Sequence, residues 1–287
     1  MTNNKNIEEQ EKELFSRLKP DYSKSKEDVW SALEKVMGEK QQAPKKKSRT
    51  IPLVWIKYAA AACFLLVFGL GLFARFYSTE ITVPSGHNSQ HTLPDGSTVY
   101  LNAESSLKYK PYWWNFTREV ELKGEAFFEV KKGESFSVYS EMGSVEVLGT
   151  SFNVYSRSDS FGVYCKSGKV RVRDNFSNEV ILLPEQFVSA NGTANTLQLN
   201  DEVNMDEIMA WRLNKFVYNT TPFTKVLGDF ERHYGIQIET DVKSLNKLHY
   251  TGLFMRDIGA EKALDIVCFS FELKLEKTGK NAYLIKQ

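Results

Sequence analysis

The sequence predicts a membrane-anchored protein that combines helices with a mainly β region and ends in a small α+β domain. Three observations lead to this fold class: an uninterrupted apolar run at residues 53–74, alternation with a period of two over residues 81–199, and a return of helical spacing beyond residue 207. With 287 residues, the chain has room for one membrane helix and two small domains.

The apolar run is long enough to cross a bilayer, since a helix of its length spans roughly 30 Å. Its one charged residue, Lys57, lies a turn inside the start, where its stem can reach the headgroups. A signal peptide is disfavoured because the run begins after fifty residues and no small-residue cleavage site follows. A buried core helix would show a polar face, and residues 58–74 show none. We therefore expect a transmembrane helix within residues 51–77, with interfacial aromatics at Trp55, Tyr58 and Tyr77.

Flanking charge predicts the orientation of this helix. Only Arg75 and then Glu80 follow it closely, whereas four basic residues precede it: Lys45, Lys46, Lys47 and Arg49. By the positive-inside tendency, the N-terminus is cytoplasmic. The protein would then sit in the inner (cytoplasmic) membrane, with everything from about residue 78 exported, into the periplasm if the cell is Gram-negative.

Residues 1–50 predict two short cytoplasmic helices. The first has four apolar side chains on one face, and Pro20 closes it; they are Ile7, Leu14, Phe15 and Leu18. The second opens at Ser25, whose hydroxyl can cap the helix while Asp28 takes the third helical position. Residues 41–50 are then a polar, basic tether.

The second helix carries one continuous apolar stripe, formed by Val29, Trp30, Leu33, Val36 and Met37. A segment this small has too little core of its own to bury a stripe centred on tryptophan. We therefore predict that the stripe contacts a cytoplasmic partner. The alternative is a loose helical hairpin, or a tail that lies on the membrane.

Residues 78–200 alternate apolar and polar side chains, for example Val99 with Leu101 and Val170 with Val172. Turn dipeptides such as Asp95-Gly96 and Lys123-Gly124 interrupt the alternation about every ten residues. This pattern predicts an antiparallel β sandwich or a β-helix-like barrel.

Residues 207–287 predict a β-α-β-β-α-β unit. After a strand near residues 213–218, Thr221 is expected to cap a helix with Pro222 at its first position. This helix spaces its apolar residues every three or four positions until Gly235 ends it. A second helix places Leu264, Val267, Cys268 and Phe271 on one face, and a final hairpin turns near residues 278–281.

No catalytic or metal-binding set is evident, so the chain is expected to be neither an enzyme nor a cofactor protein. His87 and His91 would lie about 13 Å apart along a strand, too far to share a metal ion. His233 is expected at a helix end, where a cation suits the dipole. Glu125 and Glu129 share a strand face that we expect to be solvated.

Charge and cysteine content exclude other classes. A net charge of +1 disfavours direct contact with nucleic acid. The three cysteines, Cys63, Cys165 and Cys268, show no metal spacing and are expected to be small apolar side chains rather than a bridge.

Four ordered motifs carry a resemblance to a known family. They are TLPDGSTVYLN at residues 92–102, REVELKGEAFFEV at 118–130, VLGTSFNV at 147–154 and SGKVRV at 167–172. Together they resemble the successive signatures of the FecR family of transmembrane anti-sigma factors. The end of the chain, with Trp211, Phe216, Pro222 and the run at 231–236, resembles the extra domain of Bacteroidetes FecR-like proteins. That domain is similar to the small secretin and TonB-receptor N-terminal fold.

The resemblance implies a signalling circuit. The signalling domain of an outer-membrane TonB-dependent transporter would contact the exported part, and the cytoplasmic helices would release or activate an extracytoplasmic-function sigma factor. The cytoplasmic part is shorter than the multi-helix domain of the better-known members.

Two other classes stay open at this point. A membrane-tethered glycan- or peptidoglycan-binding protein would need an aromatic platform, for which residues 112–114 are the one candidate. An exported hydrolase would need converging acids or a nucleophile, which the sequence does not show.

Overall fold

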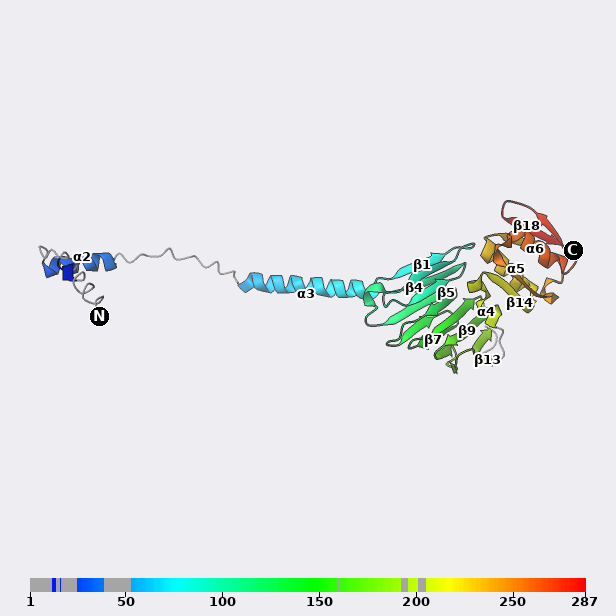
Figure 1. Ribbon diagram of the computed structural model, residues 1–287, viewed down its shortest axis with the longest axis horizontal. Coiled ribbons are helices and arrows are strands. Elements are labelled where there is room, and N and C mark those ends of the chain that lie inside the picture. The colour runs from blue at the N-terminus through cyan, green and yellow to red at the C-terminus, as the bar shows by residue number, and fades with distance from the viewer. Residues whose placement is uncertain are drawn as a thin grey trace, which may run out of the picture. The chain divides into compact units, whose positions relative to one another are not determined.

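A computed structural model of the chain describes residues 12–13, 16, 25–38, 53–158, 160–191, 196–200 and 205–287. By contacts between residues, the chain divides into two compact parts, residues 1–62 and residues 63–287. Figure 1 shows the helices and strands in chain order from blue to red. The expected first helix with Ile7, Leu14, Phe15 and Leu18 lies outside the described residues. So do the basic cluster at 45–49 and the tether at 41–50.

Helix α2 (Lys26–Gly38) begins where the sequence predicts. The backbone N–H of Asp28 donates to Ser25 Oγ at 3.2 Å, and the N–H of Ser25 donates to Asp28 Oδ2 at 3.2 Å. This reciprocal pair satisfies two donors that the first turn of a helix leaves free. The expected cap is therefore confirmed, with aspartate in the place that glutamate usually takes.

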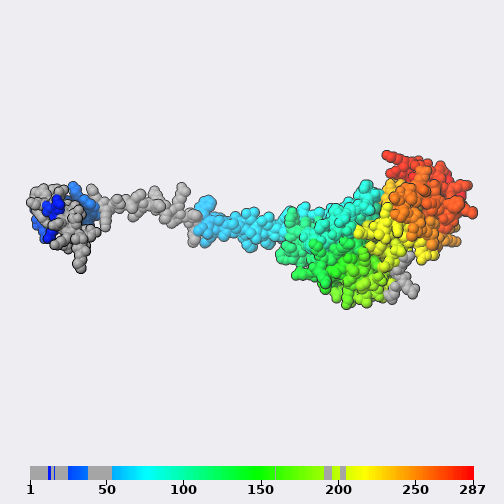
Figure 2. All heavy atoms as spheres, in the orientation of Figure 1, coloured from blue at the N-terminus to red at the C-terminus, as the bar shows by residue number. Residues whose placement is uncertain are grey.

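Helix α3 (Leu53–Phe76) contains the predicted apolar run. The most apolar 18-residue window of this helix has a mean hydropathy of 2.0, and none of that window is buried. Most of the helix stands free of other protein atoms (Figure 2), and only its last turn, at Phe73 and Arg75, lies against Tyr112 and Trp113. By length and composition, α3 is a candidate to cross a membrane once.

Thirteen strands follow among the described residues and form one hydrogen-bonded sheet. Nearly all neighbouring strands are antiparallel, as the alternation predicts. A short 3-10 helix, η1 (Pro111–Trp113), lies between the fourth and fifth strands. The strands are β1 (Thr79–Val83), β2 (Ser89–Thr92), β3 (Thr98–Leu101), β4 (Ser105–Tyr109), β5 (Arg118–Glu129), β6 (Phe136–Tyr139), β7 (Gly143–Val147), β8 (Ser151–Arg157), β9 (Ser160–Ser167), β10 (Val170–Asp174), β11 (Glu179–Leu182), β12 (Phe187–Asn191) and β13 (Gln198–Asn200).

Strand β5 connects the two halves of this β domain. Its first half pairs with β4 and β6, and its second half pairs with β3 and β8. The strand changes partners at Gly124, whose φ of +96° lies in the region that glycine tolerates. A Cβ at this position would lie 2.4 Å from Ser105 Oγ, so no larger residue fits without a shift.

One hydrophobic core joins both halves. The ring of Phe128 stacks on Phe152 at 5.1 Å and lies 6.0 Å from Phe136 of the other half, and all three are fully buried. The strictly antiparallel expectation is wrong at one pair, because β5 and β6 run parallel. After β5 the chain returns to the start of that strand, and Phe136 pairs beside Arg118.

The Asp95-Gly96 turn is held from two sides. Asp95 accepts hydrogen bonds from the backbone of Ser97 at 2.9 Å and from Arg118 Nε at 2.8 Å. Arg118 also donates to the carbonyl of Lys131 at 3.0 Å. Two of the sequence motifs, at 92–102 and 118–130, therefore meet through one ion pair.

The rest of the chain forms the C-terminal unit, residues 205–287. Strands β14 and β16 pair antiparallel, while β18 pairs parallel with β15 and antiparallel with β17. The final hairpin contributes two strands, so the observed order is β-α-β-β-α-β-β. The elements are α4 (Met205–Met209), η2 (Ala210–Leu213), β14 (Lys215–Pro222), α5 (Phe223–Tyr234), β15 (Gln237–Asp241), η3 (Leu245–Lys247), β16 (His249–Met255), η4 (Arg256–Ile258), α6 (Ala260–Phe269), β17 (Lys274–Lys277) and β18 (Ala282–Lys286).

The ends of α5 show one correct expectation and one error. Gly235 ends the helix in the left-handed conformation, with its N–H on the carbonyl of Glu231 at 2.9 Å. At the start, Pro222 is the N-cap rather than the first helical residue, and Thr221 is a buried residue of β14. Strand pairing with β16 continues to Pro222, which delays the helix by one position. Phe271 likewise follows α6 instead of lying on it.

Candidate functional site

The apolar stripe predicted for partner contact is fully presented on α2. Its largest member, Trp30, is 65 % exposed. The other members are exposed as well: Val29, Leu33, Val36 and Met37. The helix therefore brings all five side chains to one face, because their spacing along the sequence matches the helical period of 3.6 residues per turn.

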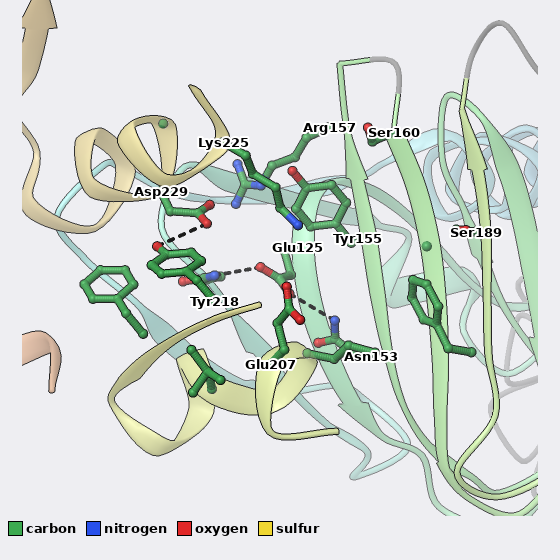
Figure 3. A pocket seen from close by; sticks show the side chains of 18 of the residues that line it. Glu125, Asn153, Tyr155, Arg157, Ser160, Ser189, Glu207, Tyr218, Lys225 and Asp229 are labelled. Carbon is green, nitrogen blue, oxygen red and sulfur yellow. Dashed lines mark hydrogen bonds between the residues drawn. The ribbon is translucent and has the colours of Figure 1, made fainter. Parts of the chain in front are cut away.

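A second candidate is a cavity of about 1270 Å³ where the C-terminal unit meets the β domain. Strands β5, β8 and β9 line one side, and α4, β14 and α5 line the other. Figure 3 shows that its labelled side chains are mostly polar and come from both sides. The sequence analysis did not predict this cavity.

Glu125 organises the β-domain side of the cavity. Its carboxylate accepts hydrogen bonds from Asn102 Nδ2 at 2.8 Å and from Asn153 Nδ2 at 3.0 Å (Figure 3). Asn153 in turn accepts from the indole Nε1–H of Trp211 at 3.3 Å. The expectation that Glu125 and Glu129 share a solvated face is therefore wrong for Glu125, which is half-buried and serves as an acceptor.

Asp229 organises the opposite side. Arg232 donates to it at 2.6 Å, and the hydroxyl of Tyr218 donates at 3.4 Å. Burial and the Asp229 charge raise the pKa of Tyr218, so the phenol stays protonated. Burial also raises the pKa of Glu207, which accepts from Thr221 Oγ1 at 3.4 Å.

Further contacts fasten the C-terminal unit to the β domain. The guanidinium carbon of Arg212 lies 3.3 Å from the ring centroid of Tyr100 and 5.0 Å from that of Phe127. The backbone N–H of Gly86 donates to the carbonyl of Arg232 at 2.7 Å. The junction therefore combines cation–π contact with backbone and side-chain hydrogen bonds.

His233 differs from its expectation as a cation at a helix end. It packs edge-on against Phe216 at 5.4 Å, and its Nε2 lies 3.3 Å from the carbonyl of Arg256. Burial, aided by the Arg256 charge, lowers the pKa of His233 to about 4. The imidazole is therefore neutral at pH 7.

The aromatic run at residues 112–114 does not form one platform. Trp114 is buried and lies 5.6 Å from Tyr109 and 6.0 Å from Phe136. Tyr112 and Trp113 instead lie against the last turn of α3. Of the three aromatic residues, Trp114 alone belongs to the hydrophobic core of the β domain.

The cysteines lie apart from one another, and the structure describes all three of them as free thiols. Among the described residues, no group of three or more His, Cys, Asp or Glu side chains is arranged to hold a metal ion. Cys165 and Cys268 are free and buried, and burial raises the pKa of each thiol to about 11. Cys63 is also free and lies on the exposed surface of α3.

Some signals of the junction are present in the sequence. Asn153 interrupts an apolar stretch between Phe152 and Val154, and Trp211 stands just before a predicted strand. The sequence alone does not show that these two residues contact each other, because they lie 58 positions apart.

Comparisons with known proteins agree with these motifs. The family described as FecR protein matches residues 79–171, and the one described as FecR, C-terminal matches residues 215–284. No match was found among the curated proteins.

Two crystal structures of a protein assigned as an anti-sigma factor, from Parabacteroides distasonis, share the fold. The first, at 2.50 Å resolution, is 30 % identical with a TM-score of 0.67, and covers 74 % of this chain and 99 % of that chain. The second, at 1.65 Å, is 30 % identical with a TM-score of 0.65, and covers 72 % and 98 %. The chain therefore belongs to the FecR family of sigma-factor regulators.

Proposed function

We propose that this chain is a transmembrane anti-sigma factor. It relays a signal from an outer-membrane TonB-dependent transporter to an extracytoplasmic-function sigma factor in the cytoplasm. The observation that carries the proposal is the exposed apolar stripe of α2, which precedes the candidate membrane helix α3, while the FecR domain follows that helix.

The stripe supplies the sigma-factor contact in this proposal. Trp30 is 65 % exposed and Leu33 is 46 % exposed. Burying either side chain against a partner contributes roughly 2 kcal/mol or more, since aromatic and large aliphatic anchors dominate such interfaces. Val29, Val36 and Met37 extend the same face.

The double change Trp30→Ala with Leu33→Ala tests the contact. The full chain, solubilised in detergent, is expected to retain the cognate sigma factor in a pull-down, whereas the variant is expected to lose it. The matched control changes Ser31 and Lys35 to alanine, because these exposed residues lie on the opposite face of α2. Equal retention by wild type and double variant would remove the stripe as the docking surface.

The proposed orientation places the N-terminus in the cytoplasm and the C-terminus in the periplasm. It is supported by the basic residues before α3 and by the single Arg75 at its end. A reporter that works only outside the cytoplasm should be active when fused after Gln287. Activity of a cytoplasmic reporter at that site, with the exported reporter silent, would reverse the orientation.

For the periplasmic partner, we propose strand addition to the C-terminal unit. Strands β15 and β17 each pair on one side only, with β18 between them. Such edges offer free backbone donors and acceptors to an extended segment. Deleting residues 209–287 should weaken binding of the transporter's signalling domain, and unchanged affinity would move the contact to the β domain.

A further inference from the structure

The β domain begins immediately after α3. The helix ends at Phe76, β1 starts at Thr79, and the N–H of Tyr77 still donates to the carbonyl of Phe73 at 2.8 Å. The three steps from Phe76 to Thr79 reach at most about 11 Å. The headgroup layer on each side of a bilayer is roughly 5–7 Å thick. If α3 crosses the membrane, the domain therefore starts at the membrane surface.

The connection between β4 and β5, residues 110–117, lies beside the end of α3. Strand β4 pairs with β1 so that Tyr109 stands opposite Thr79. The ring of Tyr112, at the start of this connection, lies 5.9 Å from the ring of Phe73 and 5.3 Å from that of Tyr77.

Further along this connection, Trp113 and Phe116 extend the cluster. The ring of Trp113 lies 5.3 Å from the guanidinium carbon of Arg75 and 4.4 Å from the ring of Phe116. Tyr112 is 60 % exposed and Phe116 is 70 % exposed, while Trp113 is half-buried. Tyr112 and Phe116 are therefore largely open to the surroundings.

We propose that residues 110–117 form a second membrane contact, which inserts Tyr112, Trp113 and Phe116 into the headgroup boundary of the bilayer that α3 crosses. This inference rests on the membrane anchoring in the proposed function. Lipid is the occupant because the rings continue the apolar surface of the last turn of α3, at the depth where tryptophan and tyrosine are enriched. Lys110 and Arg75 add positive charge beside lipid phosphates.

The contact also has a consequence for signalling. With one attachment at α3 alone, the β domain can tilt about the end of the helix. A second attachment at residues 110–117 restricts that tilt, because the domain can then rotate only about the line through the two contacts. A tilt about any other axis requires these rings to leave the lipid, or α3 to move with the domain.

Nitroxide labels on the full chain in lipid vesicles test the proposal. Asn115→Cys places a label among the rings without removing any of them, and Asn219→Cys is a matched exposed asparagine in the C-terminal unit. Both variants carry Cys63→Ala, while buried Cys165 and Cys268 remain unlabelled. A third sample labels native Cys63, within α3, as the reference for membrane insertion. Each label is then read by collisions with oxygen, which concentrates in lipid, and with a water-soluble nickel complex.

The expected result is a collision ratio that favours oxygen at positions 63 and 115 and favours nickel at position 219. Adding Phe116→Ser to the Asn115→Cys protein should shift position 115 toward nickel. A nickel-favouring ratio at 115 with an oxygen-favouring ratio at 63 would overturn the second contact and leave the anchor intact. A nickel-favouring ratio at 63 would overturn the membrane anchoring itself, and the second contact with it.

Discussion

The indole Nε1–H of Trp211 donates to the side-chain oxygen of Asn153 across 3.3 Å, and this bond joins the C-terminal unit to the β domain. Both residues are buried, at 7 % and 2 % exposure. Asn153 passes the connection on to the Glu125 carboxylate, so three side chains link η2, β8 and β5.

Trp211→Phe should destabilise the folded chain by about 1–2 kcal/mol, because it leaves a buried acceptor on Asn153 without its donor. Denaturant unfolding followed by circular dichroism measures the change. Tyr112→Phe is the control, since its ring lies away from this junction, and it is expected to stay within about 0.5 kcal/mol of wild type. A Trp211→Phe protein as stable as wild type would show that the hydrogen bond contributes nothing net.

His233 should make stability depend on pH. An unfolded histidine binds a proton below about pH 6.5, whereas folded His233 does so only near pH 4. Between these values the unfolded chain holds more protons, so the free energy of unfolding falls as pH falls, by up to about 3 kcal/mol. His233→Gln keeps a donor for the Arg256 carbonyl without titrating, and should flatten this dependence.

Unfolding curves at pH 7, 5.5 and 4.5 test the effect of His233. Exposed His87 supplies the control, because His87→Gln should retain the slope of wild type. An equal slope in the His233→Gln protein would assign the pH dependence to other groups.

The ion pair between Asp95 and Arg118 should be worth more than a surface pair. Both side chains are nearly buried, at 14 % and 11 % exposure, and Asp95 also holds the backbone of Ser97. Asp95→Asn removes the charge that Arg118 faces and should cost about 2–4 kcal/mol, near the range for breaking a buried pair.

Glu121→Gln is the matched control for Asp95→Asn, because Glu121 pairs with Lys108 at 3.4 Å on the exposed surface. It should cost less than about 1 kcal/mol. Thermal unfolding of the two variants beside wild type gives the comparison, and equal losses would contradict the difference in burial.

Gly124→Ala should destabilise the β domain strongly. The added Cβ would lie 2.4 Å from Ser105 Oγ and 2.8 Å from the carbonyl of Glu104, at a φ of +96°. Strain of this kind costs roughly 1–3 kcal/mol before any clash is relieved. Gly228→Ala in α5 meets only the flexible end of Arg232, and should be neutral or slightly stabilising in the same assay.

Local patterns account for the elements that the sequence predicts well. The cap at Ser25 and the helix end at Gly235 each depend on residues within one turn, so spacing and residue type suffice. The apolar residues of α5 likewise determine its buried face. In each case, the interactions that form the element lie close together along the chain.

Contacts distant in sequence account for what was missed. Nothing local tells that β6 runs parallel to β5, or that Asn153 meets Trp211. The start of α5 was predicted one position early, at Pro222, because the pairing of β14 with β16 continues through that residue. His233 was expected as a cation because its position at the helix end was visible, whereas the burial by Phe216 and Arg256 was not.

Only Tyr77 and Ser78 separate α3 from β1. This short link limits which insertions the protein can accept between the helix and the β domain. A helix advances by about 100° and 1.5 Å with each residue. One inserted residue that lengthens α3 would therefore swing the following domain through more than a quarter of a circle, while a four-residue insertion would nearly restore its bearing. Insertions between α3 and β1 should therefore be tolerated best when they add about one full helical turn. Signalling measured for variants with one, two, three or four added alanines tests whether it depends on this period.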